Sequence, residues 1–304
     1  MAQRALPPLQ SIRVTNHSMR ITIFGATGLL GKPLLRTWTG DDVVGLGSKD
    51  ADIREPSQVS AAVERTRPDW IVLAAAYTDV DGCETNPQLA FDVNCRGAEN
   101  VARAAKQAGS RLLFVSTDYV FNGNKTTPYE TDDPRDPVSV YGRSKAEGEL
   151  AVLQVLPEAC ILRTAWLFGN DGPCFPETIL KLAASRSELE VVNDQRGAPT
   201  YTLDLALTIQ ELCRKHAAGI VHAKNGGDCT RFDLACEIVA RAGLPTIVHP
   251  VTSEKSPRPA TRPKYSVLSP RSLKRYGLTM PTWQNALGRY LDERRAMQNA
   301  EIKG

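Results

Sequence analysis

The sequence has no long apolar segment and no strong excess of either charge. No stretch of its 304 residues approaches the ~18 consecutive apolar residues of a membrane span, and residues 1–18 lack the apolar core of a secretory signal. The net charge is only +3 and no run of lysine or arginine stands out. We therefore expect neither a membrane nor a nucleic acid as a partner.

Patterns typical of metal sites and disulfide frameworks are also missing. The seven cysteines are scattered, none belongs to a Cys-x-x-Cys pair, and the four histidines do not cluster near them. An odd number of cysteines in a chain of this length argues against a disulfide framework. The sequence therefore predicts no metal site, reduced thiols and a cytoplasmic location.

Three segments are expected along the chain. Residues 1–18 contain two adjacent prolines and no acidic residue, which predicts a flexible leader. Residues 19–165 alternate short apolar strands with helices, a pattern typical of an α/β fold with a Rossmann-like, doubly wound parallel sheet. Residues 166–304 are richer in loops and predict a smaller mixed α/β substrate lobe, with helices at about 195–215 returning to the Rossmann domain.

The individual elements follow from hydrophobic periodicity. Strands are expected at 20–24, 42–46, 70–75, 111–116, 159–164 and 219–221. Helices are expected at 29–38, 57–66, 87–108, 139–153, 177–185, 202–215, 231–242 and 283–297. Ligands of such sheets bind at the carboxyl ends of the strands, so functional residues are expected there.

A glycine-rich turn, Gly25-Ala-Thr-Gly28-Leu-Leu-Gly31, follows the first expected strand and opens a helix. That context predicts a dinucleotide site. Gly25 permits the tight turn, Gly28 lets the backbone approach a pyrophosphate, and Gly31 lets the helix lie close to the sheet. The spacing is GxxGxxG rather than GxGxxG, so an ordinary strand–helix turn remains the alternative.

The second expected strand ends in Gly47-Ser48-Lys49. An NAD site usually has an acid roughly 20 residues after the glycines, and here a hydroxyl and an ammonium stand in its place. These groups suit a 2′-phosphate, so the sequence predicts NADPH as cofactor, with NADH also possible. The alternative is that Lys49 is a solvated loop charge.

Tyr141 and Lys145 lie four residues apart on an expected helix and so share a face. A phenol is a poor acid–base group at neutral pH, and an adjacent ammonium would lower its pKa toward the working range. Thr117, at the end of an expected strand, could bond the substrate oxygen beside Tyr141, and Asn94 could hold a water or the lysine. An exposed helix pair without chemistry is the alternative.

From about Met19 to Arg295 the chain resembles the dTDP-4-dehydrorhamnose reductase family of the extended short-chain dehydrogenase/reductase superfamily. The matching stretches are AAAYTDVD at 74–81, STDYVF at 116–121, YGRSK at 141–145, RTAW at 163–166, DQRGAPT at 194–200 and Arg262-Pro263. The resemblance implies NAD(P)H-dependent reduction of the C4 keto group of a nucleotide-linked 4-keto-6-deoxy sugar. Its first candidate is dTDP-4-dehydro-L-rhamnose, reduced to dTDP-L-rhamnose with Tyr141 as proton donor.

The motifs and the resemblance together give a set of expected contacts. Cofactor contacts are expected at Gly25, Thr27, Gly28, Leu29, Leu30, Gly31, Ser48, Lys49, Asp52, Ile53, Ala74, Ala75, Ala76, Tyr77, Asn94, Tyr141 and Lys145. Substrate contacts are expected at Val80, Thr117, Asp118, Tyr119, Trp166, Gln195 and Arg262. The alternative for Trp166 is a core role, and that for Asp118 is a turn-capping role. The three cations of residues 258–264 could bind the diphosphate or belong to a solvated loop. A homodimer is left open.

Two other functions share this framework. Nucleotide-sugar epimerases and 4,6-dehydratases have the same fold, but such a dehydratase typically shows Thr-Asp-Glu where this chain has Thr117-Asp118-Tyr119. The NADP-binding regulatory subunit of methionine adenosyltransferase shares the glycine turn and the Tyr/Lys pair, but it departs from the AYTDVDGCE loop that this chain keeps. Both differences favour the reductase.

Overall fold

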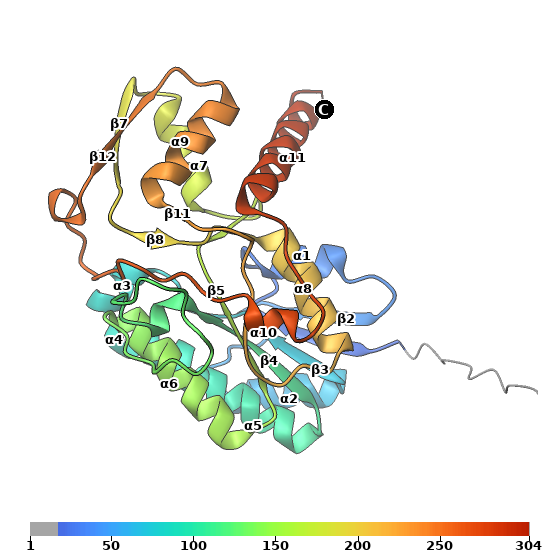
Figure 1. Ribbon diagram of the computed structural model, residues 1–304. Helices are drawn as coiled ribbons and strands as arrows, with labels where there is room; N and C mark the ends of the chain where they lie inside the picture. Colours follow the sequence, from blue (N-terminus) through green and yellow to red (C-terminus); the bar gives the residue numbers. More distant parts are fainter. Residues whose placement is uncertain (1–17, 304) are drawn as a thin grey trace, which may run out of the picture.

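A computed structural model describes residues 18–303 (Figure 1). The leader predicted for residues 1–18 lies outside the described residues, apart from Ser18. The central sheet has six strands in the order β10-β5-β4-β3-β1-β2, and every neighbouring pair is parallel. The strands are β1 (Arg20–Phe24), β2 (Asp42–Leu46), β3 (Trp70–Leu73), β4 (Arg111–Thr117), β5 (Cys160–Thr164) and β10 (Gly219–His222). The predicted fold class is confirmed.

Helices cover both faces of this sheet, because its strands carry apolar side chains on both sides. On one face α1 (Gly31–Thr37) and α8 (Thr202–Arg214) share a core with Ile21 and Ile23 of β1. On the other face, Phe24 of β1 packs in a core with residues of three helices. These helices are α2 (Pro56–Thr66), α5 (Ala98–Ala108) and α6 (Val140–Val155).

The direction of winding reverses between β1 and β3. The chain leaves β1, forms the edge strand β2 and then returns to β3 on the opposite side of β1. At such a reversal the loops after the two strands diverge and leave a crevice at their carboxyl ends. The glycine turn follows β1, and the AAAYTDVD segment begins in the loop after β3, so both motifs lie at this crevice.

A smaller lobe lies above the carboxyl edge of the sheet (Figure 1). Its core joins α7 (Phe175–Ala183), α9 (Arg231–Ala242) and α11 (Trp283–Lys303) to the parallel pair β7 (Glu188–Val192) and β12 (Ile247–Val251). The pair was not predicted, although β7 and β12 are as long as β1, β2 and β5, which were. The remaining elements are α3 (Val80–Thr85), α4 (Pro87–Phe91), β6 (Leu167–Phe168), β8 (Arg196–Gly197), β9 (Thr200–Tyr201), β11 (Cys229–Thr230) and α10 (Arg271–Lys274).

A buried ion cluster fixes α6 against β4 and β5. Glu149 of α6 and Arg163 of β5 are both fully buried, and Arg163 donates to the Glu149 carboxylate at 2.9 Å from Nε and 2.7 Å from Nη2. Ser116 of β4 and Arg135 each donate to the same carboxylate at 2.6 Å. The contacts with Arg163 and Arg135 hold the pKa of Glu149 below its usual range despite burial.

Replacing Glu149 by Ala should strongly destabilise the fold, because Arg163 would keep a buried charge without a partner. We expect a loss of about 3–5 kcal/mol in the free energy of unfolding, measured in urea. The matched control is Glu99→Ala, which removes an exposed pair with Arg103 one helical turn away and should cost less than about 1 kcal/mol. Similar losses in the two variants would contradict this account of the cluster.

Candidate active site

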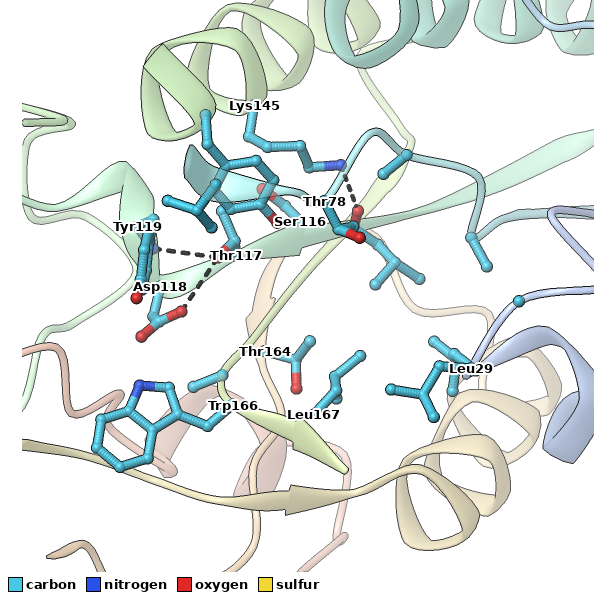
Figure 2. A pocket seen from close by; sticks show the side chains of 18 of the residues that line it. Leu29, Thr78, Ser116, Thr117, Asp118, Tyr119, Lys145, Thr164, Trp166 and Leu167 are labelled. Atoms are coloured by element: carbon cyan, nitrogen blue, oxygen red, sulfur yellow. Dashed lines mark hydrogen bonds between the residues drawn. The ribbon is translucent and has the colours of Figure 1, made fainter. Parts of the chain in front are cut away.

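A cavity of about 390 Å³ opens at the carboxyl ends of the strands, between the glycine turn and the smaller lobe (Figure 2). It brings together many of the residues predicted from the sequence, which come from five separate segments of the chain. These lining residues are Gly25, Gly28, Leu29, Leu30, Gly31, Ala74, Ala76, Val80, Thr117, Asp118, Tyr119, Tyr141, Lys145 and Trp166.

The glycine turn needs two of its glycines for steric reasons. Gly25 has φ +87°, and a Cβ there would lie 2.5 Å from the backbone nitrogen of Ala75. A Cβ on Gly31 would lie 2.1 Å from the carbonyl oxygen of Gly25. Both distances are shorter than non-bonded atoms tolerate. Only glycine therefore lets the turn approach the loop after β3 and lets the start of α1 lie against the turn, which exposes bare backbone to the cavity.

The end of β2 contains an acid that the sequence analysis missed. Ser48 and Lys49 are exposed and do not line the cavity. The chain then turns back, so that the carboxylate of Asp50 accepts a hydrogen bond from the backbone N–H of Gly47 at 2.8 Å. A Cβ on Gly47 would lie 3.4 Å from that carboxylate and 3.0 Å from the Thr27 methyl group. The sequence analysis considered Ser48 and Lys49 in place of the usual acid and did not consider Asp50, which the turn returns to Gly47.

Other predicted cofactor residues lie behind the cavity wall. The carboxylate of Asp52 binds Arg54 at 3.0 Å, which holds the pKa of Asp52 below its usual range. Ile53 is buried in the core beneath β1. Ala75 adjoins Gly25 without lining the cavity. These side chains shape the wall around the glycine turn.

Asn94 anchors the loop after β3 from behind. Its side chain accepts from the backbone N–H of Tyr77 at 2.8 Å and donates to the Tyr77 carbonyl and to Ser144 of α6, each at 3.0 Å. The helix predicted at 87–108 is interrupted here by a π-helical segment, Asp92–Gly97. Such segments often accompany functional sites. A Cβ on Gly148 would lie 2.2 Å from the Asn94 carbonyl, so this glycine allows α6 to lie close to the π segment.

Tyr141 and Lys145, both in the first turns of α6, line the cavity, and Figure 2 shows Lys145 there. The helix begins after Ser139, whose hydroxyl accepts from the Gly142 N–H at 3.1 Å. Lys145 is almost fully buried, and its Nζ donates to the Val115 carbonyl at 2.8 Å. The Tyr141 ring meets the Tyr119 ring edge-on, with the centroids 5.8 Å apart.

The electrostatics of the pair differ from the expectation. Burial raises the pKa of the Tyr141 phenol, and the neighbouring Thr117 hydroxyl opposes this only in part. Burial also lowers the pKa of Lys145 to about 7, with the Glu149 carboxylate acting in the opposite direction. The ammonium was expected to lower the pKa of the tyrosine. Desolvation outweighs that effect here, because the Lys145 nitrogen is directed to the backbone of β4.

The pKa of Lys145 should leave a signature in the pH dependence of stability. Between about 7 and its ordinary value of 10.5, the unfolded chain binds a proton that the folded chain releases. Raising the pH through this window therefore stabilises the fold, by up to about 1.4 kcal/mol per pH unit. We expect the unfolding free energy of the wild type to rise with pH relative to that of Lys145→Met, measured in urea. Parallel curves would show that the folded protein keeps this lysine charged.

The end of β4 supplies a hydroxyl and a carboxyl to the cavity. Thr117 donates to the Asp118 carboxylate at 3.0 Å, and Ser266 donates to its second oxygen. Asp118 is almost fully buried, and burial raises its pKa to about 6. Tyr119 and Val80 line the cavity beside them. Asp118 thus orders the strand end as well as lining the cavity.

Trp166 lines the cavity on the side of the smaller lobe (Figure 2). Its φ of +47° is unusual for a residue other than glycine. A Cβ on Gly197 would lie 2.4 Å from the indole, so the ring rests directly on that backbone. The Arg231 guanidinium lies over the indole, 3.6 Å from the ring centroid. Trp166 is therefore held in place by contacts on its ring and by a strained backbone.

Two predicted substrate residues do not line the cavity. Arg262 donates to the Asp81 carboxylate at 3.1 and 2.9 Å through its two terminal nitrogens. Gln195 donates from its side chain to Ser253 at 3.0 Å, and its carbonyl accepts from the Arg231 backbone N–H at 3.3 Å. Arg262 therefore binds α3, and Gln195 contacts other segments of the lobe.

Several cavity residues were missed by the sequence analysis. Some follow directly from the ends of β4 and β5, and the rule that ligands bind at strand ends could have found them. Others come from the lobe, where no local pattern distinguishes them. The missed residues are Thr78, Val115, Ser116, Thr164, Ala165, Leu167, Pro173, Phe175 and Arg231.

The fold and the arrangement of this cavity are those of the extended short-chain dehydrogenase/reductase class. The family model described as "RmlD substrate binding domain" matches residues 19–296. The chain belongs to this family, that of the dTDP-4-dehydrorhamnose reductases, as its sequence predicts.

Named relatives cover nearly the whole chain. A dTDP-4-dehydrorhamnose reductase of Mycobacterium tuberculosis is 42% identical over 286 residues, 90% of this chain and 93% of the relative. A probable dTDP-4,6-dihydroxy-2-methyloxan-3-one 4-ketoreductase of Streptomyces antibioticus is 42% identical over 275 residues, 88% and 93% of the two chains. A crystal structure of dTDP-4-dehydrorhamnose reductase from Bacillus anthracis in complex with NADP superposes with a TM-score of 0.89, at 38% identity, and covers 91% and 99% of the two chains.

Two further properties concern residues 18–303 alone. Within this range no helix combines the length and apolar character needed to cross a bilayer. In the same range, histidine, cysteine and acidic side chains nowhere gather in a group of three that could hold a metal ion.

Proposed function

We propose that this protein reduces the C4 keto group of a dTDP-linked 4-keto-6-deoxy sugar with NADPH. The observation that carries the proposal is a single cavity in which the glycine turn, the Tyr141/Lys145 pair and the Trp166 side of the lobe meet. The relatives named above support reduction of a dTDP-linked keto sugar as the class of reaction. The first candidate substrate is dTDP-4-dehydro-L-rhamnose.

The residues around the glycine turn fit a dinucleotide. Side chains at Gly25 and Gly31 would collide with backbone, and the turn leaves bare backbone facing the cavity, as close approach of a pyrophosphate requires. Leu29, Leu30 and Ala76 form the adjoining wall. When bound, the reduced nicotinamide supplies the hydride for C4 of the sugar. Lys145 lies in the same cavity, where its ammonium form can hold ribose hydroxyls.

Tyr141 is the proton donor in this proposal. Reduction of a ketone needs a proton at the oxygen that was the carbonyl oxygen, so the donor must start in its protonated form. A phenol with its ordinary pKa is already protonated at neutral pH, and burial raises the pKa of Tyr141 further. The Thr117 hydroxyl lines the same cavity; its proton, which Asp118 accepts in the free protein, would turn to the sugar oxygen when the substrate binds.

Tyr141→Phe should lower kcat/KM for dTDP-4-dehydro-L-rhamnose by ~100- to 10,000-fold, the usual contribution of a positioned acid. NADPH consumption is the measurement. The matched control is Tyr276→Phe, which removes a hydroxyl bonded to Ala218 at the surface and should leave the rate unchanged. An unaltered rate in Tyr141→Phe would remove this tyrosine from the chemistry.

The preference between NADPH and NADH should depend on two residues of opposite charge after β2, Lys49 and Asp50. Lys49 would attract a 2′-phosphate, whereas the Asp50 carboxylate beside Gly47 and Thr27 would repel it and accept from a ribose 2′-hydroxyl. We expect NADPH to be preferred. Asp50→Asn should raise the ratio of kcat/KM for NADPH to that for NADH several-fold, and Lys49→Gln should lower it. A strong preference of the wild type for NADH would overturn the cofactor proposal.

A dehydratase or epimerase is less well supported by the cavity. The position that would hold the additional glutamate of a dehydratase is Tyr119, which is buried and stacked edge-on against Tyr141. Among the lining residues, the only carboxyl group is that of Asp118, and both its oxygens accept hydrogen bonds from Thr117 and Ser266. Water elimination from dTDP-glucose by the purified protein would contradict the reductase proposal.

A further inference from the structure

The lobe side of the substrate cavity contains one arginine whose charge is not already matched. Arg262 is bound by the Asp81 carboxylate at 2.9 Å, and Arg258 lies 4.0 Å from the same carboxylate. Arg231 lines the cavity. Among residues 18–300, whose side chains are described, no carboxylate lies close enough to Arg231 to form an ion pair with it. Arg258 and Arg262 therefore share the Asp81 carboxylate as a counter-charge, and Arg231 has no such partner.

Aromatic rings hold the Arg231 guanidinium by contact with its flat faces. Its central carbon lies 3.6 Å from the Trp166 ring centroid and 4.9 Å from that of Phe175. When a guanidinium stacks on a ring, only its flat faces are in contact with the ring. Its N–H groups lie at the edge of the guanidinium plane and remain able to donate hydrogen bonds. Those groups can therefore bind a planar or tetrahedral anion in a two-pronged fashion.

The surrounding backbone fixes this arginine in place. Arg231 is the first residue of α9, whose capping residue Thr230 exchanges hydrogen bonds with Asp233 in both directions. The backbone N–H of Arg231 donates to the Gln195 carbonyl, and the indole beneath the guanidinium rests on Gly197. Two neighbouring segments thus position one cation before any ligand arrives, which lowers the entropy cost of binding.

Asp118 acts on the Arg231 charge through space, but the two side chains form no ion pair. Both carboxylate oxygens of Asp118 already accept hydrogen bonds, from Thr117 and Ser266. Burial lowers the pKa of Arg231, while Tyr119 and Asp118 oppose that shift. A buried guanidinium with so little compensation is costly in the free protein, and an anion would relieve the cost.

We propose that Arg231, on the platform formed by Trp166 and Phe175, binds the diphosphate of the nucleotide-sugar substrate. This inference rests on the proposed function, because it assigns the anionic part of that substrate. The glycine turn and Trp166 lie at opposite ends of the cavity in Figure 2, where Leu29 marks the turn. The pyrophosphate of the cofactor and the diphosphate of the substrate therefore have separate anchors.

The test is equilibrium binding of dTDP and of thymidine to the full chain by calorimetry. The wild type should bind dTDP more tightly than thymidine. Arg231→Met should weaken dTDP by ~10- to 100-fold, as expected for the loss of hydrogen bonds to a charged group, and should leave thymidine unchanged. Arg262→Met serves as the comparison and should retain most of the preference for dTDP, since its guanidinium is bound by Asp81.

A second variant guards against a folding defect. NADPH binding, which uses the other end of the cavity, reports whether each variant is folded. Arg231→Lys keeps the charge but loses the planar edge, so its affinity for dTDP should fall between those of wild type and Arg231→Met. If Arg231→Met does not bind NADPH, the lysine variant alone decides, and a dTDP affinity equal to that of wild type overturns the proposal.

The possible failures are distinguishable. An Arg231→Met protein that binds NADPH and keeps its preference for dTDP overturns the role of Arg231 and leaves the reductase proposal standing. Loss of the preference in Arg262→Met instead assigns the diphosphate to that arginine. A wild type that binds NADPH but does not distinguish dTDP from thymidine overturns the nucleotide-sugar substrate itself.

Discussion

The attachment of α6 to the carboxyl end of β4 is the contact on which the site depends. Lys145 reaches the Val115 carbonyl, and one turn later Glu149 accepts from Ser116 while holding Arg163 of β5. These bonds fix the rotation of α6, because its side chains one turn apart share a face. That rotation directs Tyr141 into the cavity. The ion cluster therefore determines where the phenol stands, although none of its charges needs to touch a ligand.

The same burial that makes this contact rigid sets the protonation of the pair. Desolvation favours the neutral form of any ionisable group, so it raises the pKa of Tyr141 and lowers that of Lys145. Burial causes both shifts. An ion pair between a phenolate and an ammonium would instead lower the pKa of the tyrosine and raise that of the lysine. A neutral phenol is the form that reduction needs. The raised pKa also makes the phenol a weaker acid, so its proposed role depends on its position in the cavity and not on a lysine that lowers its pKa.

Residues adjacent along the chain were predicted well, and residues brought together by folding were not. The parallel sheet, the helix at 231–242 and the glycine turn followed from periodicity and local sterics, and the predicted Tyr141/Lys145 pair does line one cavity. The turn that returns Asp50 to Gly47 involves side-chain geometry that no period encodes. The Asp81–Arg262 pair joins segments more than a hundred residues apart. No pattern in the neighbouring sequence could therefore indicate that a carboxylate already binds this arginine. Arg231 was missed for the same reason.

Contacts from the lobe hold Trp166 in a strained backbone conformation at the end of β5. A positive φ outside glycine costs about 1–3 kcal/mol and persists only where surrounding contacts enforce it. Here the Trp166 carbonyl accepts from the Thr200 N–H at 3.1 Å, and Gly197 and Arg231 contact the ring. All three contacts come from segments that follow β5 and belong to the lobe. The lobe thus holds the tryptophan at the end of β5 in a conformation that the strand alone would not adopt. An aromatic surface fixed in this way can present a cation to the substrate at a constant distance from Tyr141.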